Sequence, residues 1–249
     1  MKLGFSNYLT RGDVLKEIKF AKDHGFQAYE LGIHCTADFH YTDQELRNFK
    51  EASDGLTVTA HLPYYLQTAT QLDEIHKANM KVLEKSMVIS HKAGAENVVI
   101  HPGYMEHSDD LENLTKNLRD IMMVARRYDF KVCLENLPAI PNLNCSESDD
   151  LTSVLGSIPD LYATFDIGHA NTSPQEPADY FARISEYVKH VHMHDNLGEQ
   201  DEHLVPGRGT VQFSSLFRKM KEAGYEGPVI LELPSYDDIL AGKDFFENL

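Results

Sequence analysis

Short runs of apolar, β-branched residues alternate along this chain with longer segments in which apolar residues recur at helical spacing. The apolar runs predict strands at 2–6, 28–32, 57–61, 97–101, 131–135, 162–166, 188–192 and 229–233. The longer segments predict helices near 13–24, 43–54, 71–93, 109–128, 148–157, 177–186, 213–223 and 238–247. Strand and helix therefore alternate from one end of the sequence to the other.

Boundary signals support these helices. The stretches TDQE at 42–45 and SDDL at 108–111 place small polar or acidic residues at helix starts. Gly25, Gly94 and Gly224 stand where a helix is expected to end before the next strand. The segments HGFQAYELG, AGAENVVIH and AGYEGPVILEL repeat this transition from helix through glycine to strand.

Eight strand–helix units within 249 residues favour a closed parallel (β/α)₈ TIM barrel. The competing fold is a doubly wound open sheet, which normally carries a glycine-rich phosphate loop after its first strand. Here that loop reads SNYLTRGD and holds one glycine. Because the sequence has no linker, low-complexity tract or break in composition, we expect one domain over residues 1–249.

Composition indicates the cellular compartment in which the protein is expected. No stretch approaches the roughly 20 consecutive apolar residues of a membrane span, and MKLGFSNYLTRGD lacks the apolar region of a signal peptide. The three cysteines, Cys35, Cys133 and Cys145, form no C-x-x-C pair. This odd, widely spaced set argues against disulfides and thiolate zinc sites, and we expect a cytoplasmic protein.

Polar residues follow the apolar runs at the ends of the predicted strands. His61, His101 and Glu135 end the third, fourth and fifth strands, and Asp166 ends the sixth, with His169 three residues later. The remaining members of this series are His192 at the end of the seventh strand, Asp201 and His203 in the next loop, and Glu232 in the eighth strand.

In a barrel, the carboxyl ends of the strands meet at one mouth, so these five histidines and four carboxylates are expected to share a cavity. A single histidine at a strand end is more often a hydrogen-bonded polar group than a metal ligand. Six consecutive strands ending in this way are harder to explain without cations, because burying such groups unpartnered costs several kcal/mol each. Imidazole and carboxylate ligands without thiolate suit Zn²⁺, Mn²⁺, Co²⁺ or Fe²⁺.

The ordered motifs HLPY, HPG, ENLP, DIGHA, HVHMHDN, DEH, PGRG and LEL resemble the xylose isomerase-like TIM barrel superfamily. That superfamily contains sugar and sugar phosphate isomerases and epimerases as well as endonuclease IV. Each motif is weak alone, but their order is specific and extends from His61 to Glu232.

The resemblance implies two site arrangements. By similarity to the isomerases and epimerases, one divalent metal would be bound by Glu135, Asp166, His192 and Glu232, with the two glutamates moving protons. By similarity to endonuclease IV, three zinc ions would be bound, with Glu135 bridging two of them. The full set of ligands would then be His61, His101, Glu135, Asp166, His169, His192, Asp201, His203 and Glu232.

Two chemistries follow, namely proton transfer at a metal-polarised carbonyl of a small sugar or sugar phosphate, and phosphodiester hydrolysis at clustered zinc ions. In the first, His169, Arg208 and Tyr64 are candidates for binding the substrate. Arg208 in PGRG is equally well explained as an exposed turn residue paired with an acid, and Tyr64 could instead stack on a base. A barrel that binds sugar or metal without turnover is a third alternative.

The loops at the expected mouth favour the small substrate. Residues 33–45, 62–72, 102–112, 136–150 and 167–180 contain no lysine or arginine, and the whole chain has a formal charge of −16. Phosphate contacts with DNA require basic side chains, so an abasic-site DNA endonuclease is disfavoured and a small phosphoester remains open. We therefore predict a metal-dependent isomerase or epimerase with one to three Zn²⁺ or Mn²⁺ ions per chain, and leave its oligomeric state open.

Overall fold

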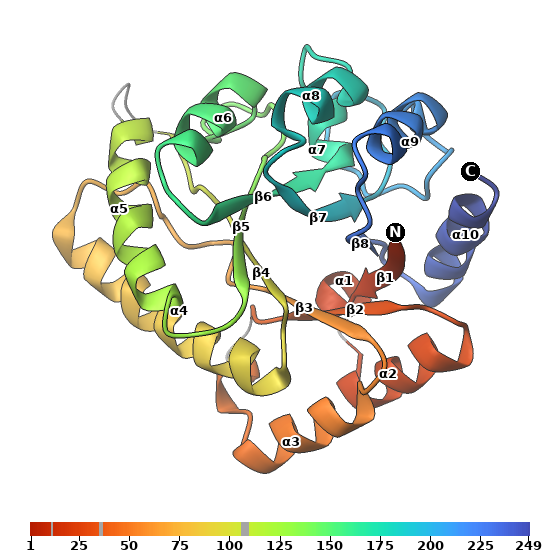
Figure 1. The fold of residues 1–249 in the computed structure, drawn as a ribbon, viewed down its shortest axis with the longest axis horizontal. Coiled ribbons are helices and arrows are strands. Elements are labelled where there is room, and N and C mark those ends of the chain that lie inside the picture. Colours follow the sequence, from red (N-terminus) through yellow and green to blue (C-terminus); the bar gives the residue numbers. More distant parts are fainter. Residues whose placement is uncertain (11, 35–36, 106–109) are drawn as a thin grey trace.

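The strands form a closed barrel in which every neighbouring pair is parallel (Figure 1). This computed structural model describes residues 1–10, 12–34, 37–105 and 110–249. The strands are β1 (Lys2–Ser6), β2 (Ala28–Gly32), β3 (Thr57–His61), β4 (Asn97–Ile100), β5 (Lys131–Glu135), β6 (Leu161–Asp166), β7 (Val188–Met193) and β8 (Pro228–Leu231). The ring closes where β8 pairs with β1, so the predicted (β/α)₈ barrel is confirmed.

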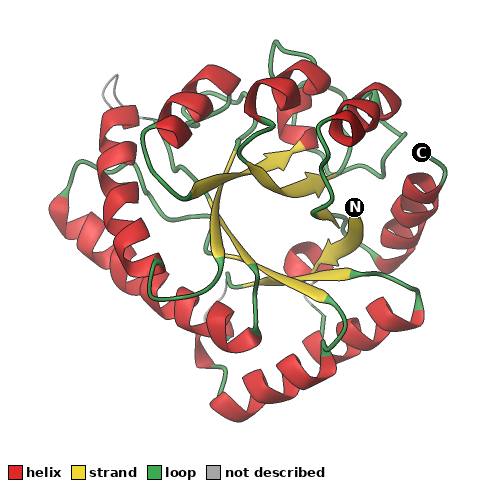
Figure 2. Cartoon of the chain, viewed as in Figure 1, coloured by secondary structure: helices red, strands yellow, loops and turns green. Residues whose placement is uncertain are grey.

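Helices surround the strands on the outside of the ring (Figure 2). They are α2 (Val14–Asp23), α3 (Asp43–Ala52), α4 (Asp73–Ala93), α5 (Asp110–Ala125), α6 (Ser148–Gly156), α8 (Pro177–Ile184), α9 (Phe213–Glu222) and α10 (Tyr236–Glu247). Each matches a predicted helix to within a few residues at either end. The shift is largest at α5, which ends three residues earlier than predicted.

The helices pack against the barrel through the periodic positions that predicted them. In α5, Leu114, Leu118 and Ile121 recur at helical spacing and are buried, whereas Lys116 and Arg119 on the other side are exposed. Burying each of these leucine or isoleucine side chains contributes about 1.5–3 kcal/mol to folding. The core therefore lies between the strands and the helices, which leaves the carboxyl ends of the strands free for polar residues.

The predicted signals for helix starts and ends are confirmed where the structure describes them. Thr42 caps α3 in a reciprocal capping box with Glu45. Gly25, Gly94 and Gly224 adopt φ values of 73°, 85° and 71°, the left-handed conformation that favours glycine at a helix end. The first two residues of the start signal at 108–111 lie outside the described residues.

Three short helices were not predicted: α1 (Asn7–Thr10), η1 (Asp38–His40) and α7 (Ile167–Asn171). They are too short to show helical periodicity in the sequence. Helix α7 begins directly after β6 because the Asp166 side chain accepts a hydrogen bond from the backbone amide of His169 at 2.7 Å. This turn directs both side chains into the mouth of the barrel.

The cysteines behave as isolated thiols where they are described. Cys133 and Cys145 are free and buried, and burial raises the pKa of the Cys133 thiol to about 12. Cys35 lies outside the described residues. Within those same residues, no helix combines the length and apolarity needed to cross a membrane.

Candidate metal centre

Glu135, the last residue of β5, lies among three histidines at the ends of other strands. Its Oε2 atom is 2.8 Å from Nε2 of His101 and 3.3 Å from Nε2 of His61. Its Oε1 atom is 2.8 Å from Nδ1 of His192, which lies on β7. Because β3, β4, β5 and β7 end at the same side of the barrel, residues far apart in sequence meet around one carboxylate.

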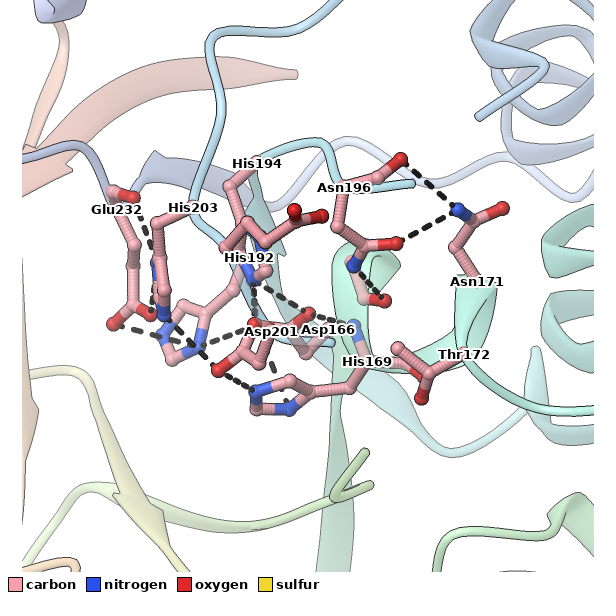
Figure 3. Close-up of polar contacts among 12 residues, drawn as sticks. Asp166, His169, Asn171, Thr172, His192, His194, Asn196, Asp201, His203 and Glu232 are labelled. Carbon is pink, nitrogen blue, oxygen red and sulfur yellow. Dashed lines mark hydrogen bonds and ion pairs between the residues drawn. The ribbon is translucent and has the colours of Figure 1, made fainter. Parts of the chain in front are cut away.

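Asp201 makes a second centre in the loop after β7. Its Oδ2 atom is 3.3 Å from Nε2 of His169 and 3.2 Å from Nε2 of His203, contacts that are drawn as dashed lines in Figure 3. The loop is joined to the end of β7 by paired backbone hydrogen bonds of 2.8 Å between Asp195 and Leu204. His203 has a φ of 48°, in a region that non-glycine residues seldom adopt, and such strain often accompanies functional sites.

Glu232 follows β8 and joins the two centres. One of its carboxylate oxygens lies 3.8 Å from Nδ1 of His192, and the other lies 3.9 Å from Nδ1 of His203. The same His203 nitrogen is 2.9 Å from the Glu232 carbonyl oxygen, which fixes the ring against β8. The structure thus places all nine predicted metal-site residues in one continuous polar cluster, while their roles stay predictions.

The donor atoms fit a divalent metal. Nε2 of His101, Oε2 of Glu135, Oε1 of Glu232 and Oδ1 of Asp201 are buried and have no hydrogen-bond partner among the described residues. The close approach of His101 to Glu135 lacks hydrogen-bond geometry, as expected for two groups directed at a shared cation. Several triads have nitrogen and oxygen atoms within 4.8 Å of one another, including His61–His101–Glu135, His61–His192–Glu232 and His194–Asp201–His203.

Opposite charges control protonation in this cluster. Burial favours the neutral form of Glu135, but the charges of His192 and His101 outweigh burial and hold its pKa well below the ordinary value. Burial likewise opposes the charged form of His192, yet Glu232, Glu135 and Glu30 raise its pKa well above the ordinary value. Protons on the histidines therefore balance the negative charge of the carboxylates when metal is absent, and a bound cation would displace these protons.

Three further buried residues belong to the cluster although the sequence analysis did not select them. Glu30 on β2 contacts His190 and His192, and His194 contacts Asp166 at 3.1 Å. Each had a signal in the sequence. Glu30 falls near the end of a predicted strand in YELG, and 190, 192 and 194 alternate as residues on one face of a strand do.

A cavity of about 240 Å³ opens above the cluster. Its polar lining residues are His61, His101, Glu135, His169, Asp201, His203 and Glu232. Its other lining residues are Tyr64, Gly103, Tyr104, Leu137, Pro138 and Leu143. Among these lining residues there is no lysine or arginine, so the cavity offers a small molecule both metal ligands and aromatic or apolar surface.

The predicted substrate-binding residues occupy different positions. Tyr64 and His169 line the cavity. Arg208 lies in the loop after β7 with its side chain 64% exposed, and its guanidinium is 3.6 Å from Asp238. It is absent from the described lining of the cavity. A role for any of the three in binding substrate stays a prediction.

Comparison with known proteins identifies the family. The sequence pattern of the xylose isomerase-like TIM barrel family matches residues 18–249. The chain belongs to this family. The predicted resemblance is therefore confirmed, and the order of motifs from His61 to Glu232 lies within the matched region.

Members with different chemistries resemble this chain. An uncharacterized protein of Methanocaldococcus jannaschii is 29% identical over all of this chain and 89% of its own length. Fructoselysine 3-epimerase of Escherichia coli is 25% identical over 65% of this chain and 61% of that protein. A probable endonuclease 4 of Aquifex aeolicus is 23% identical over 96% and 94%. The solved structure of a D-tagatose 3-epimerase-like protein superposes with a TM-score of 0.91 at 28% identity, covering 100% of this chain and 96% of its own.

Proposed function

We propose that this protein is a divalent-metal-dependent epimerase or isomerase of a small sugar or sugar phosphate. The observation that supports this most directly is the placement of Glu135 and Glu232 on one small cavity whose described lining residues include no lysine or arginine. The similarity to fructoselysine 3-epimerase and to a D-tagatose 3-epimerase-like structure supports the same reaction class.

The metal would be bound by Glu135, Asp166, His192 and Glu232, an oxygen and nitrogen set that suits Mn²⁺, Co²⁺ or Zn²⁺. When bound, such a cation polarises a carbonyl and its neighbouring hydroxyl and thereby acidifies the adjacent C–H bond. The buried oxygens of Glu135 and Glu232 that have no hydrogen-bond partner support this assignment.

Glu135 and Glu232 would move the proton. Both carboxylates are almost completely buried, and the charges of His192 and His101 outweigh burial and hold the pKa of Glu135 well below its ordinary value, so this group is ionised. In epimerisation one carboxylate removes the proton and the other returns a proton to the opposite face. In isomerisation a single carboxylate carries it between adjacent carbons. Tyr64 and His169 would orient substrate oxygens, and Arg208 would reach the substrate only from the rim of the mouth.

A second candidate function is hydrolysis of a small phosphate ester at two or three zinc ions. It is favoured by the donors beyond the four-residue set, since His61, His101, Asp201 and His203 are gathered beside Glu135 and Glu232. The similarity to a probable endonuclease 4 supports it as well. DNA is the disfavoured substrate, because five of the mouth loops contain no lysine or arginine, and phosphate contacts require such side chains.

Proton exchange separates the two functions. Metal-loaded protein is incubated in D₂O with a panel of free ketoses and ketose phosphates, and loss of the C–H signal next to the carbonyl is followed by NMR. We expect exchange with the wild type and a fall of about 10²-fold or more in Glu135→Gln and Glu232→Gln. Glu226→Gln is the control, because Glu226 is exposed at the amino-terminal end of the barrel.

Elemental analysis accompanies this assay. One ion per chain with proton exchange supports the epimerase or isomerase. Three zinc ions per chain, no exchange across the panel and release of phosphate from a small ester would contradict the epimerase or isomerase. These results would instead support the hydrolase.

A further inference from the structure

Glu30 is a carboxylate enclosed inside the barrel beneath the proposed metal centre. It lies on β2, is fully buried, and is absent from the described lining of the cavity. Thr59 on the neighbouring strand donates a hydrogen bond to its Oε2 at 3.1 Å. Nε2 of His190 lies 2.9 Å from the same oxygen. These contacts hold the carboxylate in one position.

His192 connects this enclosed carboxylate to the metal centre. Its Nε2 atom lies 3.2 Å from Oε1 and 3.4 Å from Oε2 of Glu30. Its Nδ1 atom faces the opposite way, 2.8 Å from Glu135 and 3.6 Å from Asp166. The His192 ring therefore lies between Glu30 on one side and Glu135 and Asp166 on the other. Nε2 contacts Glu30, and Nδ1 contacts the other two carboxylates.

The two nitrogens of an imidazole that binds a metal have different tasks. The ligating nitrogen offers a lone pair, so the other nitrogen carries the proton and needs an acceptor. A carboxylate in that position fixes the ring and makes it a stronger ligand. Burying an ionised carboxylate costs several kcal/mol, so packing alone gives no reason for a glutamate at this point of β2.

We propose that Glu30 is a positioning residue, which accepts a hydrogen bond from Nε2–H of His192 and thereby directs Nδ1 of that ring at the divalent metal. Thr59 and His190 keep Glu30 in place. The inference rests on the proposed function in one respect, because that function makes His192 a metal ligand. It adds that the strength of metal binding depends on a residue that touches neither metal nor substrate.

The test measures metal binding instead of turnover. Glu30→Gln keeps the size of the side chain but removes its charge, and Glu17→Gln is the matched control. Glu17 is equally buried and accepts hydrogen bonds from the hydroxyl groups of Tyr29 and Tyr236. Tyr29 lies on the outer side of β2 and Tyr236 lies in α10, so these contacts of Glu17 lie outside the metal centre. Calorimetry with Mn²⁺ and Zn²⁺ gives the dissociation constant, and elemental analysis gives the number of ions.

We expect Glu30→Gln to weaken metal binding about 10–100-fold with an unchanged number of ions, and Glu17→Gln to leave it within about twofold. An unchanged dissociation constant in Glu30→Gln would overturn the inference. So would the loss of one ion at saturating metal while another ion stays bound, because Glu30, His190 and His192 would then form an enclosed metal site themselves.

A measurement on the wild type keeps the inference testable if Glu30→Gln does not fold. In zinc-loaded protein labelled with ¹⁵N, we expect His192 to retain the proton on Nε2 and to bind zinc through Nδ1. Zinc on Nε2 would overturn the inference. Wild type that binds no divalent metal would overturn the proposed function and this inference together, whereas tight binding that does not depend on Glu30 would overturn the inference alone.

Discussion

The Asp195 side chain accepts a hydrogen bond from the backbone amide of Gly209 at 2.9 Å, and this contact closes the loop that carries Asp201 and His203. The same buried carboxylate also accepts hydrogen bonds from the amides of Asn196, Gly207 and Val211. A Cβ at Gly209 would lie 2.3 Å from Oδ1 of Asp195, so the backbone approaches the carboxylate more closely than a side chain would allow. The Asp195 carboxylate thus holds four backbone amides of the loop after β7 in place.

Asp195→Ala would leave those amides without their acceptor. Because each unsatisfied buried group costs about 1–3 kcal/mol, we expect the free energy of unfolding to fall by about 3 kcal/mol or more. Urea denaturation measures this fall, and Glu199→Ala, an exposed position in the same loop, should leave the stability within about 0.5 kcal/mol. Equal stabilities for the two variants would contradict this account of the loop.

Gly168→Ala tests the packing beneath the metal centre. A Cβ at this position would lie 2.0 Å from Cε1 of His194, a fully buried ring that contacts Asp166. We expect a lower melting temperature and weaker metal binding, because His194 has to move. Gly156→Ala is the matched control, since the nearest atom to its Cβ would be the Tyr187 hydroxyl at 3.7 Å and alanine suits the end of a helix. A Gly168→Ala protein as stable as Gly156→Ala would show that His194 is not held in place.

Metal-free protein should lose stability as the pH rises from neutral to alkaline. Burial disfavours the charged form of His203, but the hydrogen bond to Asp201 and the charge of Glu232 outweigh it and raise the pKa of His203 to about 9. A histidine whose pKa is raised on folding stabilises fully below its unfolded value of about 6.5. That contribution, about 3 kcal/mol, is lost as the pH rises through about 9.

Thermal melts of chelator-treated protein between pH 6 and 10 measure this loss, and saturating Zn²⁺ should reduce it because metal replaces the proton. His203→Asn should show a shallower decline than the parent protein. An identical decline in both proteins would assign the pH dependence to other groups.

The sequence predicted the strands and the longer helices because their apolar periodicity reflects packing against the barrel. It did not predict α7, because five residues are too few for periodicity and the helix depends on a hydrogen bond to Asp166. Two strands end earlier than predicted. His101 and Glu232 lie just beyond β4 and β8, where the side chains still reach the cavity.

Part of the site was predicted, because in any parallel barrel the carboxyl ends of the strands meet at one mouth. That rule brought the nine selected residues together, but it does not say which histidine nitrogen faces which carboxylate. The partners of Glu30 and His194 depend on the closure of the barrel across β2 and β7, which no local pattern encodes. The ion pair of Arg208 with Asp238 in α10 likewise requires the folded chain.

His101→Asn distinguishes a one-metal centre from a cluster. In the proposed function His101 lies outside the four-residue metal set, although its Nε2 atom is 2.8 Å from Glu135. We therefore expect His101→Asn to keep one tightly bound ion and to lose no more than about tenfold in proton-exchange rate, which is less than removal of an acid–base group costs. Elemental analysis and the exchange assay give both values, with Glu135→Gln as the variant that should lose both binding and exchange. If His101→Asn instead lowers the number of zinc ions and abolishes turnover of a phosphate ester, His61, His101 and Glu135 bind a required ion and the hydrolase is the function of this site.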